Sequence, residues 1–404
     1  MRIAIVGGGL AAAAAAEELR TRGHDGQIDI FGTEPHVPYN RPPLSKGLLL
    51  GTEEQDSIFV HDAQWYADQT ISLHLGQEVT GLELNERHVL VGPDAHAYDR
   101  LLLATGSKPR RLEAADQAGR VAYLRTLEDC LTLRESLRPD QHVVVVGGGW
   151  IGLEVAAAAR TAGSSVTVIE SLDLPLVRVL GPEIATVFAD LHRAHGVDLR
   201  LSATIESFTR ADAGQTVVRL KDGSQLTADL VVVGIGVAPN DDLAIKAGLA
   251  VDNGILVDEQ LKTSDPHVFA VGEVANQHHP SLGRRIRVEH WDTAIEQAKV
   301  AAQNMLGASE DYARLPYFFT DQYDLGMEYV GSIGPGGYDD LILRGDLASQ
   351  FTAFWMRDGR VEAAMHANDW DAIGPIRQLV GQSLDRAQLH QLRDNSVDLA
   401  ALTP

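Results

Sequence analysis

One glycine-rich pattern occurs twice in this chain, with Gly7 and Gly147 at equivalent positions 140 residues apart. Residues 2–23 read RIAIVGGGLAAAAAAEELRTRG, and residues 142–163 read HVVVVGGGWIGLEVAAAARTAG. Each copy has a β-branched run, a glycine turn, an alanine-rich helical stretch and a second apolar strand. The predicted strands are residues 3–6, 28–31, 143–146 and 166–169. The repeat therefore predicts two β-α-β units of the kind that bind dinucleotides.

Three positions of each glycine turn have separate tasks. The first glycine makes the tight turn, and the second lets the backbone approach a pyrophosphate. The third position must be small so that the helix packs on the strand, and the helix N-terminus then offers N–H groups to the phosphates. One isolated match is weak, whereas two complete units strongly favour nucleotide binding. The positions are Gly7, Gly9 and Ala12 in the first copy and Gly147, Gly149 and Gly152 in the second.

A carboxylate after the second strand of each unit is a candidate ribose ligand. Glu170 directly follows strand 166–169, where it would accept hydrogen bonds from an adenosine ribose and repel a 2′-phosphate. No Arg or Lys occupies the next three positions, so the second unit is predicted to take NADH rather than NADPH. In the first copy Gly32 stands at that position and Glu34 is the candidate acceptor. The alternative is that Glu34 is a solvated loop acid.

Composition limits the classes of partner. A chain of 404 residues predicts two or three domains, and 34 Lys and Arg against 56 Asp and Glu give a net charge of −22. Phosphate backbones and anionic lipids would repel such a chain, so we expect neither nucleic-acid nor membrane binding. The apolar run at residues 3–16 is too short to span a membrane, and its three glycines do not fit a secretion signal.

The single cysteine, Cys130, excludes an internal disulfide, a CxxC redox pair and an iron–sulfur cluster. It is predicted to be a buried small side chain, and a reducing cytoplasm is the expected location. His278 and His279, with two further histidines nearby, lack the spacing and the additional ligands of a zinc sphere. We therefore predict no metal site.

Six further segments accompany the repeat. Together with the repeat, these segments make the chain resemble the flavoprotein reductases that have two dinucleotide-binding domains. Among these, it resembles the NADH:ferredoxin reductases of bacterial Rieske-type aromatic dioxygenases and haem-thiolate monooxygenases. The resemblance runs from residue 3 to about residue 330. The segments are RPPLSK at 41–46, LATG at 103–106, LRTLED at 124–129, GIGVAP at 234–239, TSDP at 263–266 with VFAVGE at 268–273, and DQ at 321–322.

The resemblance implies an α/β fold with two Rossmann-like dinucleotide-binding domains, arranged as in glutathione reductase, and a C-terminal α+β domain. The expected FAD-binding domain is discontinuous, at 1–108 and 241–313, with the NADH-binding domain at 109–240 and the C-terminal domain at 314–404. Residues 351–356 and 361–365, joined through Asp358-Gly359, are predicted to form a hairpin. A monomer and a dimer are both open.

The resemblance also implies the reaction. FAD would take a hydride from NADH and pass single electrons to a 2Fe-2S ferredoxin, Rieske-type or adrenodoxin-like, that feeds an oxygenase. The alternatives are an NAD(P)H oxidase or quinone reductase and an NADH-sensing flavoprotein. An acidic ferredoxin would need a local basic patch on this acidic chain. The candidates are Arg110, Arg111, Arg284, Arg285, Arg287, Arg314 and Arg344.

Two residues are the candidate catalytic groups. In the family, a lysine matching Lys46 lies beside the reactive edge of the flavin, and a glutamate matching Glu154 lies under the nicotinamide. We expect a Lys46–Glu154 ion pair in a partly dry cleft. The alternatives are that Lys46 is a surface lysine and that Glu154 only complements the dipole of its helix.

The resemblance assigns the remaining contacts residue by residue. Trp291 is expected at a helix start close to the flavin, or else packed on the core. Three positions depart from the family pattern. Thr33 stands where an acidic residue is common, Glu273 stands where Asp is usual, and Phe319 stands where many relatives have Trp. The candidate FAD contacts are Gly7, Gly9, Ala12, Glu34, Arg41, Lys46, Ala104, Thr105, Gly106, Gly272, Glu273 and Trp291; those for NAD are Gly147, Gly149, Ile151, Gly152, Glu154, Glu170 and Gly236.

Overall fold

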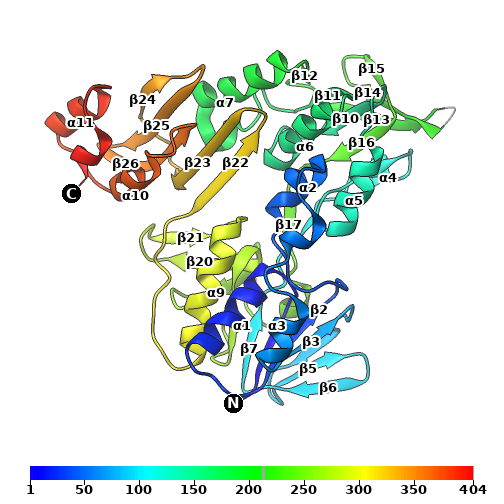
Figure 1. The fold of residues 1–404 in the computed structure, drawn as a ribbon, viewed down its shortest axis with the longest axis vertical. Coiled ribbons are helices and arrows are strands. Elements are labelled where there is room, and N and C mark those ends of the chain that lie inside the picture. Colours follow the sequence, from blue (N-terminus) through cyan, green and yellow to red (C-terminus); the bar gives the residue numbers. More distant parts are fainter. Residues whose placement is uncertain (212–213, 404) are drawn as a thin grey trace. The chain divides into compact units, whose positions relative to one another are not determined.

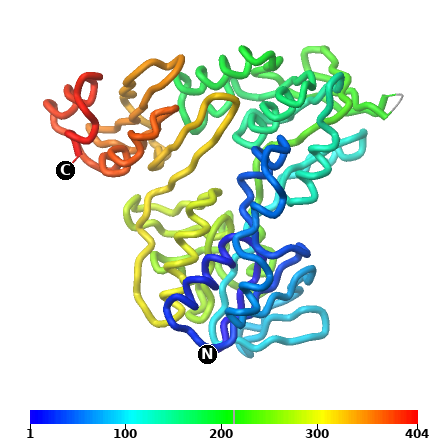
Figure 2. Tube along the Cα trace, viewed as in Figure 1, coloured from blue at the N-terminus to red at the C-terminus, as the bar shows by residue number. Residues whose placement is uncertain are grey.

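The computed structural model describes residues 1–211 and 214–403. Two units emerge, each assembled from segments far apart in the sequence, as the tube in Figure 2 shows by its colours. Unit 1 holds residues 1–42, 54–108 and 237–316, and unit 2 holds residues 43–53, 109–236 and 317–404. The three-domain division stays a prediction; residues 212–213 and 404 of its NADH-binding and C-terminal domains lie outside the described residues.

A five-stranded parallel sheet organises unit 1, in the order β19-β7-β1-β2-β3. Every residue of the central strand is buried, as expected for a parallel sheet covered on both faces. Helices α1 and α9 pack side by side in this unit (Figure 1), because the alanines of α1 let the backbones approach closely. The elements are β1 (Ile3–Val6), α1 (Leu10–Thr21), β2 (Ile28–Gly32), β3 (Ile71–Leu75), β7 (Arg100–Leu103), β19 (Val268–Ala270) and α9 (Trp291–Met305).

Smaller elements complete unit 1. Two three-stranded sheets have the orders β4-β5-β6 and β18-β20-β21, and β8 pairs with β17 near the points where the chain leaves and re-enters the unit. Their bounds are β4 (Gly81–Glu83), β5 (His88–Val91), β6 (Asp94–Ala97), β8 (Ser107–Pro109), β17 (Val237–Pro239), β18 (Ile255–Val257), β20 (Ala275–His279) and β21 (Arg284–Ile286), with helices α3 (Ala63–Asp68) and α8 (Asp242–Lys246) and the 3-10 turns η2 (Gln55–Ile58) and η4 (Gly272–Val274).

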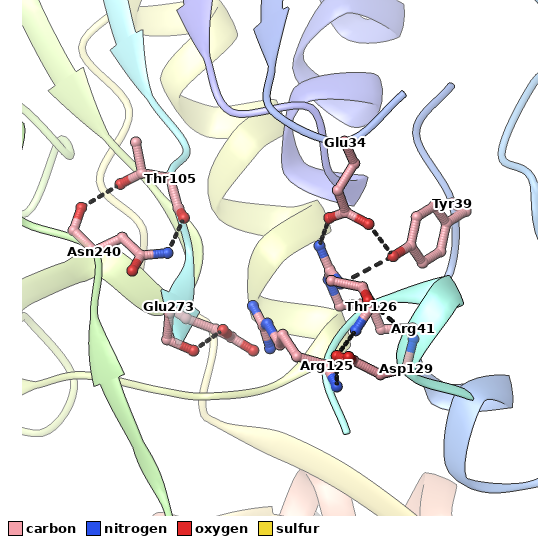
Figure 3. A network of polar contacts seen from close by, with 10 residues as sticks. Glu34, Tyr39, Arg41, Thr105, Arg125, Thr126, Asp129, Asn240 and Glu273 are labelled. Carbon is pink, nitrogen blue, oxygen red and sulfur yellow. Dashed lines mark hydrogen bonds and ion pairs between the residues drawn. The ribbon is translucent and has the colours of Figure 1, made fainter. Parts of the chain in front are cut away.

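Unit 2 contains the second parallel sheet, in the order β12-β11-β10-β16-β9. The antiparallel strands β13, β14 and β15 form a separate sheet. Helix α5 begins at a capping box, in which Thr126 and Asp129 exchange hydrogen bonds (Figure 3). The bounds are β9 (Val121–Ala122), β10 (His142–Val146), β11 (Ser165–Ile169), β12 (Asp198–Arg200), β13 (Ile205–Arg210), β14 (Thr216–Leu220), β15 (Gln225–Ala228), β16 (Leu230–Val233), η1 (Pro42–Ser45), α2 (Gly47–Leu50), α4 (Glu113–Asp116), α5 (Leu127–Ser136), α6 (Trp150–Thr161) and α7 (Val177–Ala194).

An antiparallel sheet in the order β22-β23-β26-β25-β24 forms the C-terminal part of unit 2. Its predicted hairpin is present, and Asp358 and Gly359 both have positive φ, as a two-residue type I′ turn requires. The bounds are β22 (Tyr317–Gln322), β23 (Leu325–Gly331), β24 (Asp340–Asp346), β25 (Gln350–Arg357), β26 (Arg360–Ala367), α10 (Ile373–Leu379), α11 (Arg386–Arg393) and η5 (Leu399–Leu402).

The predicted fold class is confirmed by two parallel α/β sheets and a C-terminal antiparallel sheet with helices. The four strands expected around the glycine turns agree with the observed strands to within one residue at each end. Cys130 is fully buried in α5, as predicted. No helix in the described part of the chain has both the length and the apolar character needed to cross a membrane.

Candidate functional site

The first glycine turn in unit 1 leaves room for a phosphate group. Gly7 has a φ of 120°, and a Cβ there would lie 2.1 Å from the carbonyl oxygen of Ala104, so only glycine fits. Among the described residues, no heavy atom lies within 4 Å of a Cβ built on Gly9. Helix α1 starts beside this space without a side-chain cap and without an acid in its first turn, and Ala12 is fully buried. The open space and the helix N-terminus fit an anionic pyrophosphate.

Glu34 and Arg41 lie together in unit 1, as Figure 3 shows. The Arg41 guanidinium donates to Glu34 Oε1 at 2.7 Å, and the Tyr39 hydroxyl donates to Glu34 Oε2 at 2.5 Å. Glu34 is therefore held by two partners and is not the solvated loop acid of the alternative interpretation. Thr33, beside it, is exposed and has no carboxylate, so Glu34 is the residue that can offer a carboxylate to a ribose at this strand end.

Long-range hydrogen bonds hold two more candidate FAD segments. The Thr105 hydroxyl donates to the Asn240 carbonyl oxygen at 2.7 Å, and the Asn240 amide donates to the Thr105 carbonyl oxygen at 2.9 Å (Figure 3). Gly106 follows with a φ of 65°. The backbone N–H of Gly272 donates to the side chain of Gln297 on α9 at 2.8 Å. These bonds position both turns within unit 1.

Glu273 and Trp291 also have partners in unit 1. Glu273 lies in η4 and accepts a hydrogen bond from the Ser107 hydroxyl. The additional methylene relative to the usual Asp is thus accommodated with a side-chain partner. Trp291 is the first residue of α9, as predicted, and its indole N–H donates to Asn40 Oδ1 at 2.8 Å. The indole therefore has a hydrogen-bond partner within unit 1.

The second glycine turn, in unit 2, repeats this geometry. Gly147 has a φ of 105°, and a Cβ on Gly152 would lie 2.1 Å from the carbonyl oxygen of Gly147. A Cβ on Gly149 would meet only one atom within 4 Å, at 3.9 Å, so this position is open as in the first copy. Helix α6 has no side-chain cap at Gly149 and no acid in its first turn. Ile151 is 45% exposed, and Gly236 has a φ of 93°.

Glu170 is held by the backbone of the same turn. Its Oε2 accepts from the Gly148 N–H at 2.7 Å, and its Oε1 accepts from the Leu172 N–H at 2.9 Å and the Ser171 hydroxyl at 3.1 Å. The sequence did not indicate these bonds. They fix the carboxylate at the strand end next to the glycine turn, where a ribose ligand is needed.

Lys46 and Glu154 form the predicted ion pair, with 2.8 Å between Nζ and Glu154 Oε1, and both residues belong to unit 2. The side chains are 17% and 4% exposed, so Lys46 is not a surface lysine. Glu154 also accepts from the hydroxyls of Ser45 and Thr320. Helix α2 packs on α5 and α6, and β22 packs on α6, which brings these four residues together. Three donors on one carboxylate exceed what the helix dipole alone explains.

Strand β22 contributes residues that the sequence analysis did not assign. Thr320 and Gln322 are each 1% exposed and lie on one face of the strand, whereas Asp321 between them is exposed. Phe319 places its ring centroid 5.4 Å from the Lys46 ammonium, so the Trp-to-Phe departure preserves an aromatic ring against the lysine. The available signal was that Thr320 and Gln322 stand at alternate positions of the strand, on the face opposite the charged Asp321.

The basic-patch candidates separate by burial. Arg344 is only 8% exposed and donates to the Val397 and Leu392 carbonyl oxygens, so its prediction as a landing residue is wrong. Arg287, with a side chain 9% exposed, is paired with Glu289 and is equally unsuitable. Both were selected by charge alone, which does not reveal burial. Arg110 and Arg111 are exposed.

Cys130 is poorly suited to thiol chemistry, and the described residues include no cluster of side chains that could hold a metal ion. Burial raises the pKa of the Cys130 thiol to about 11, which disfavours the reactive thiolate. Within residues 1–211 and 214–403, no three His, Cys, Asp or Glu side chains gather in a way that could hold a metal ion.

Known proteins share this architecture along the whole chain. The pyridine nucleotide-disulphide oxidoreductase family model matches residues 1–302, and the reductase C-terminal model matches residues 317–403. The ferredoxin–NAD(+) reductase component of the anthranilate 1,2-dioxygenase system of Burkholderia cepacia is 43% identical over 400 residues, covering 98% of this chain and 97% of that protein. Putidaredoxin reductase of Pseudomonas putida is 39% identical over 406 residues, covering 98% and 95%.

A solved structure agrees. The covalent putidaredoxin reductase–putidaredoxin complex contains a chain that superposes with a TM-score of 0.94 at 37% identity, covering 99% of this chain and 97% of that one. The glycine turns, the C-terminal sheet and these similarities lead to one assignment. The chain belongs to the pyridine nucleotide-disulphide oxidoreductase family and, within it, to the ferredoxin reductases with a reductase C-terminal domain.

Proposed function

We propose that the protein is an FAD-containing NADH:ferredoxin reductase that supplies electrons to an oxygenase. The observation that carries the proposal is the pair of open glycine turns, each at an uncapped helix N-terminus, together with the buried Lys46–Glu154 cluster. The named activities of the relatives, which are 43% and 39% identical over nearly the whole chain, support the same reaction.

Unit 1 would hold FAD and unit 2 would hold NADH. The space at Gly9 suits the FAD pyrophosphate, and Glu34 suits its ribose, because both of its carboxylate oxygens retain lone pairs beside their present donors. In unit 2 the space at Gly149 and the carboxylate of Glu170 have the same tasks for NADH. The carboxylate favours a free 2′-hydroxyl over a 2′-phosphate.

Bound FAD supplies hydride acceptance from NADH and release of electrons one at a time. The chain contributes position and charge. Lys46, stiffened by the two prolines before it and fixed by Glu154, provides one positive charge to stabilise the reduced flavin. Glu154 is held as an acceptor by three donors and is suited to orient the carboxamide of the nicotinamide. Hydride transfer requires no general base, and we assign none.

A 2Fe-2S ferredoxin is the proposed electron acceptor, as the name of the anthranilate-system relative suggests for that protein. Arg110 and Arg111 are the proposed basic pair for an acidic ferredoxin, since both are exposed, although Arg111 also forms an ion pair with Asp116 at 3.0 Å. The cytoplasmic location stays a prediction that rests on the single cysteine.

The purified protein should release FAD, not FMN, on denaturation, and NADH should reduce it rapidly. Turnover with a 2Fe-2S ferredoxin should fall steeply as salt rises through physiological ionic strength, where the Debye length is about 8 Å, while ferricyanide reduction falls far less. Reversing the charges of Arg110 and Arg111 should raise the ferredoxin KM and leave flavin reduction fast. Reactivity with oxygen or quinones but with no ferredoxin would identify an oxidase instead, and stable reduction without turnover would indicate a sensor.

A further inference from the structure

A line of buried hydrogen bonds connects Glu154 with His192 across unit 2. Thr320 Oγ1 lies 2.5 Å from Glu154 Oε1, Gln322 Nε2 lies 3.1 Å from Thr320 Oγ1, and His192 Nε2 lies 2.8 Å from Gln322 Oε1. All four side chains are at most 4% exposed. They come from α6, β22 and α7, so the line joins the second nucleotide-binding helix to the C-terminal sheet.

The chemistry of the groups allows one arrangement of protons along this line. Glu154 Oε1 faces the Lys46 ammonium, which can only donate, so the carboxylate is the acceptor and the Thr320 hydroxyl must donate to it. The Thr320 oxygen is then left to accept, which requires the amide N–H of Gln322 on that side. The Gln322 carbonyl oxygen therefore faces His192, whose Nε2 must carry a proton.

Burial keeps this arrangement in place. Burial lowers the pKa of His192 to about 4, against the opposing effect of its bond to Gln322, so the ring is neutral and donates from Nε2 near neutral pH. Every donor in the line consequently points toward the Glu154 carboxylate, and no member can reverse without leaving a buried acceptor facing another acceptor.

We propose that Thr320, Gln322 and His192 are positioning residues that orient Glu154 for hydride transfer, so that the C-terminal sheet takes part in NADH oxidation. The inference rests on the proposed function, because it requires Glu154 to act on the nicotinamide. Thr320 acts first in the line, since it is the one member that touches the carboxylate.

Four single variants and one double variant test the proposal. Thr320→Val removes the hydroxyl with little change in shape, and Thr320→Ser restores it. Thr352→Val is the matched control, because Thr352 is a buried threonine of the same sheet whose hydroxyl has no hydrogen-bond partner among the described residues. Glu154→Gln is the reference for loss of the carboxylate charge. Flavin content and melting temperature are recorded for each, and flavin reduction by NADH is followed by anaerobic stopped-flow absorbance, with NAD⁺ affinity measured by calorimetric titration.

The limiting rate of flavin reduction should fall at least about tenfold in Thr320→Val, which is near the lower end of the range expected for one lost hydrogen bond to a charged group. Thr320→Ser should recover most of that rate, and Thr352→Val should match the wild type. The NAD⁺ dissociation constant should rise in Thr320→Val and return toward the wild-type value in Thr320→Ser. Adding Thr320→Val to Glu154→Gln should change the rate far less than it does alone, because both act through one carboxylate.

A full-rate Thr320→Val enzyme beside a slow Glu154→Gln enzyme would overturn the inference and leave the proposed function intact. A loss in Thr320→Val that serine does not recover, or that adds undiminished to Glu154→Gln, would also overturn it. Wild-type rates in Glu154→Gln would instead remove the proposed role of Glu154, and the inference with it.

Discussion

Replacing His192 with glutamine should reduce the loss of stability that we expect for this protein in acid. His192 is fully buried, and burial, with a smaller contribution from His195, lowers its pKa to about 4, although its hydrogen bond to Gln322 opposes the shift. An unfolded chain has a histidine pKa of about 6.5. Below that pH the unfolded chain binds a proton that the folded protein does not, so stability present above pH 6.5 is lost as the pH falls toward 4.

The difference between the two pKa values, at about 1.4 kcal/mol for each pKa unit, sets a limit of about 3 kcal/mol for this effect. About 2 kcal/mol of it falls between pH 7 and pH 5, where the folded ring is still neutral. Glutamine retains an amide N–H that can donate to Gln322 and does not titrate in this range.

Urea unfolding at pH 7, 6 and 5, followed by tryptophan fluorescence, measures the effect. Trp150 packs edge-on against Phe188 of α7, so its emission reports on the surroundings of His192. The free energy of unfolding of the wild type should fall by about 2 kcal/mol more than that of His192→Gln between pH 7 and pH 5. His390→Gln, on the exposed face of α11, should track the wild type. A constant difference between wild type and His192→Gln over this range would refute the reasoning.

Two further changes separate fold from ligand binding. Gly149→Ala should leave the melting temperature unchanged but abolish tight NADH binding, because the protein leaves space for its Cβ where the nucleotide would lie. Gly152→Ala should lower the free energy of unfolding by about 1–3 kcal/mol, because its Cβ would be forced against the carbonyl group of Gly147. Equal effects of the two substitutions on stability would contradict the assignment of this space to the nucleotide. Glu170→Gln combined with Ser171→Arg should narrow the preference in kcat/KM for NADH over NADPH, and a wild type that already uses both coenzymes equally would remove the role of Glu170.

Local rules of the sequence account for several elements of the fold. The strands around Gly7 and Gly147 and the Asp358-Gly359 hairpin could be predicted in this way. Each depends on residues within about one helical turn or one tight turn, where glycine geometry and side-chain periodicity decide the outcome. The duplication then restricted the fold, because each β-α-β unit must bury its helix on a parallel sheet.

Contacts between side chains that are far apart in the sequence depend on tertiary packing. Glu154 accepts hydrogen bonds from two hydroxyl groups, 109 and 166 positions away in the chain, and from an ammonium group 108 positions away. No spacing rule relates such distant positions. The burial of Arg344 also depends on the packing of distant segments. Its charge is typical of a surface residue, yet it lies beneath the C-terminal segment, where backbone carbonyl groups accept hydrogen bonds from its guanidinium. The packing of α2 and β22 on α6, set by the fold of the whole unit, converts scattered polar residues into one ordered network around a single carboxylate.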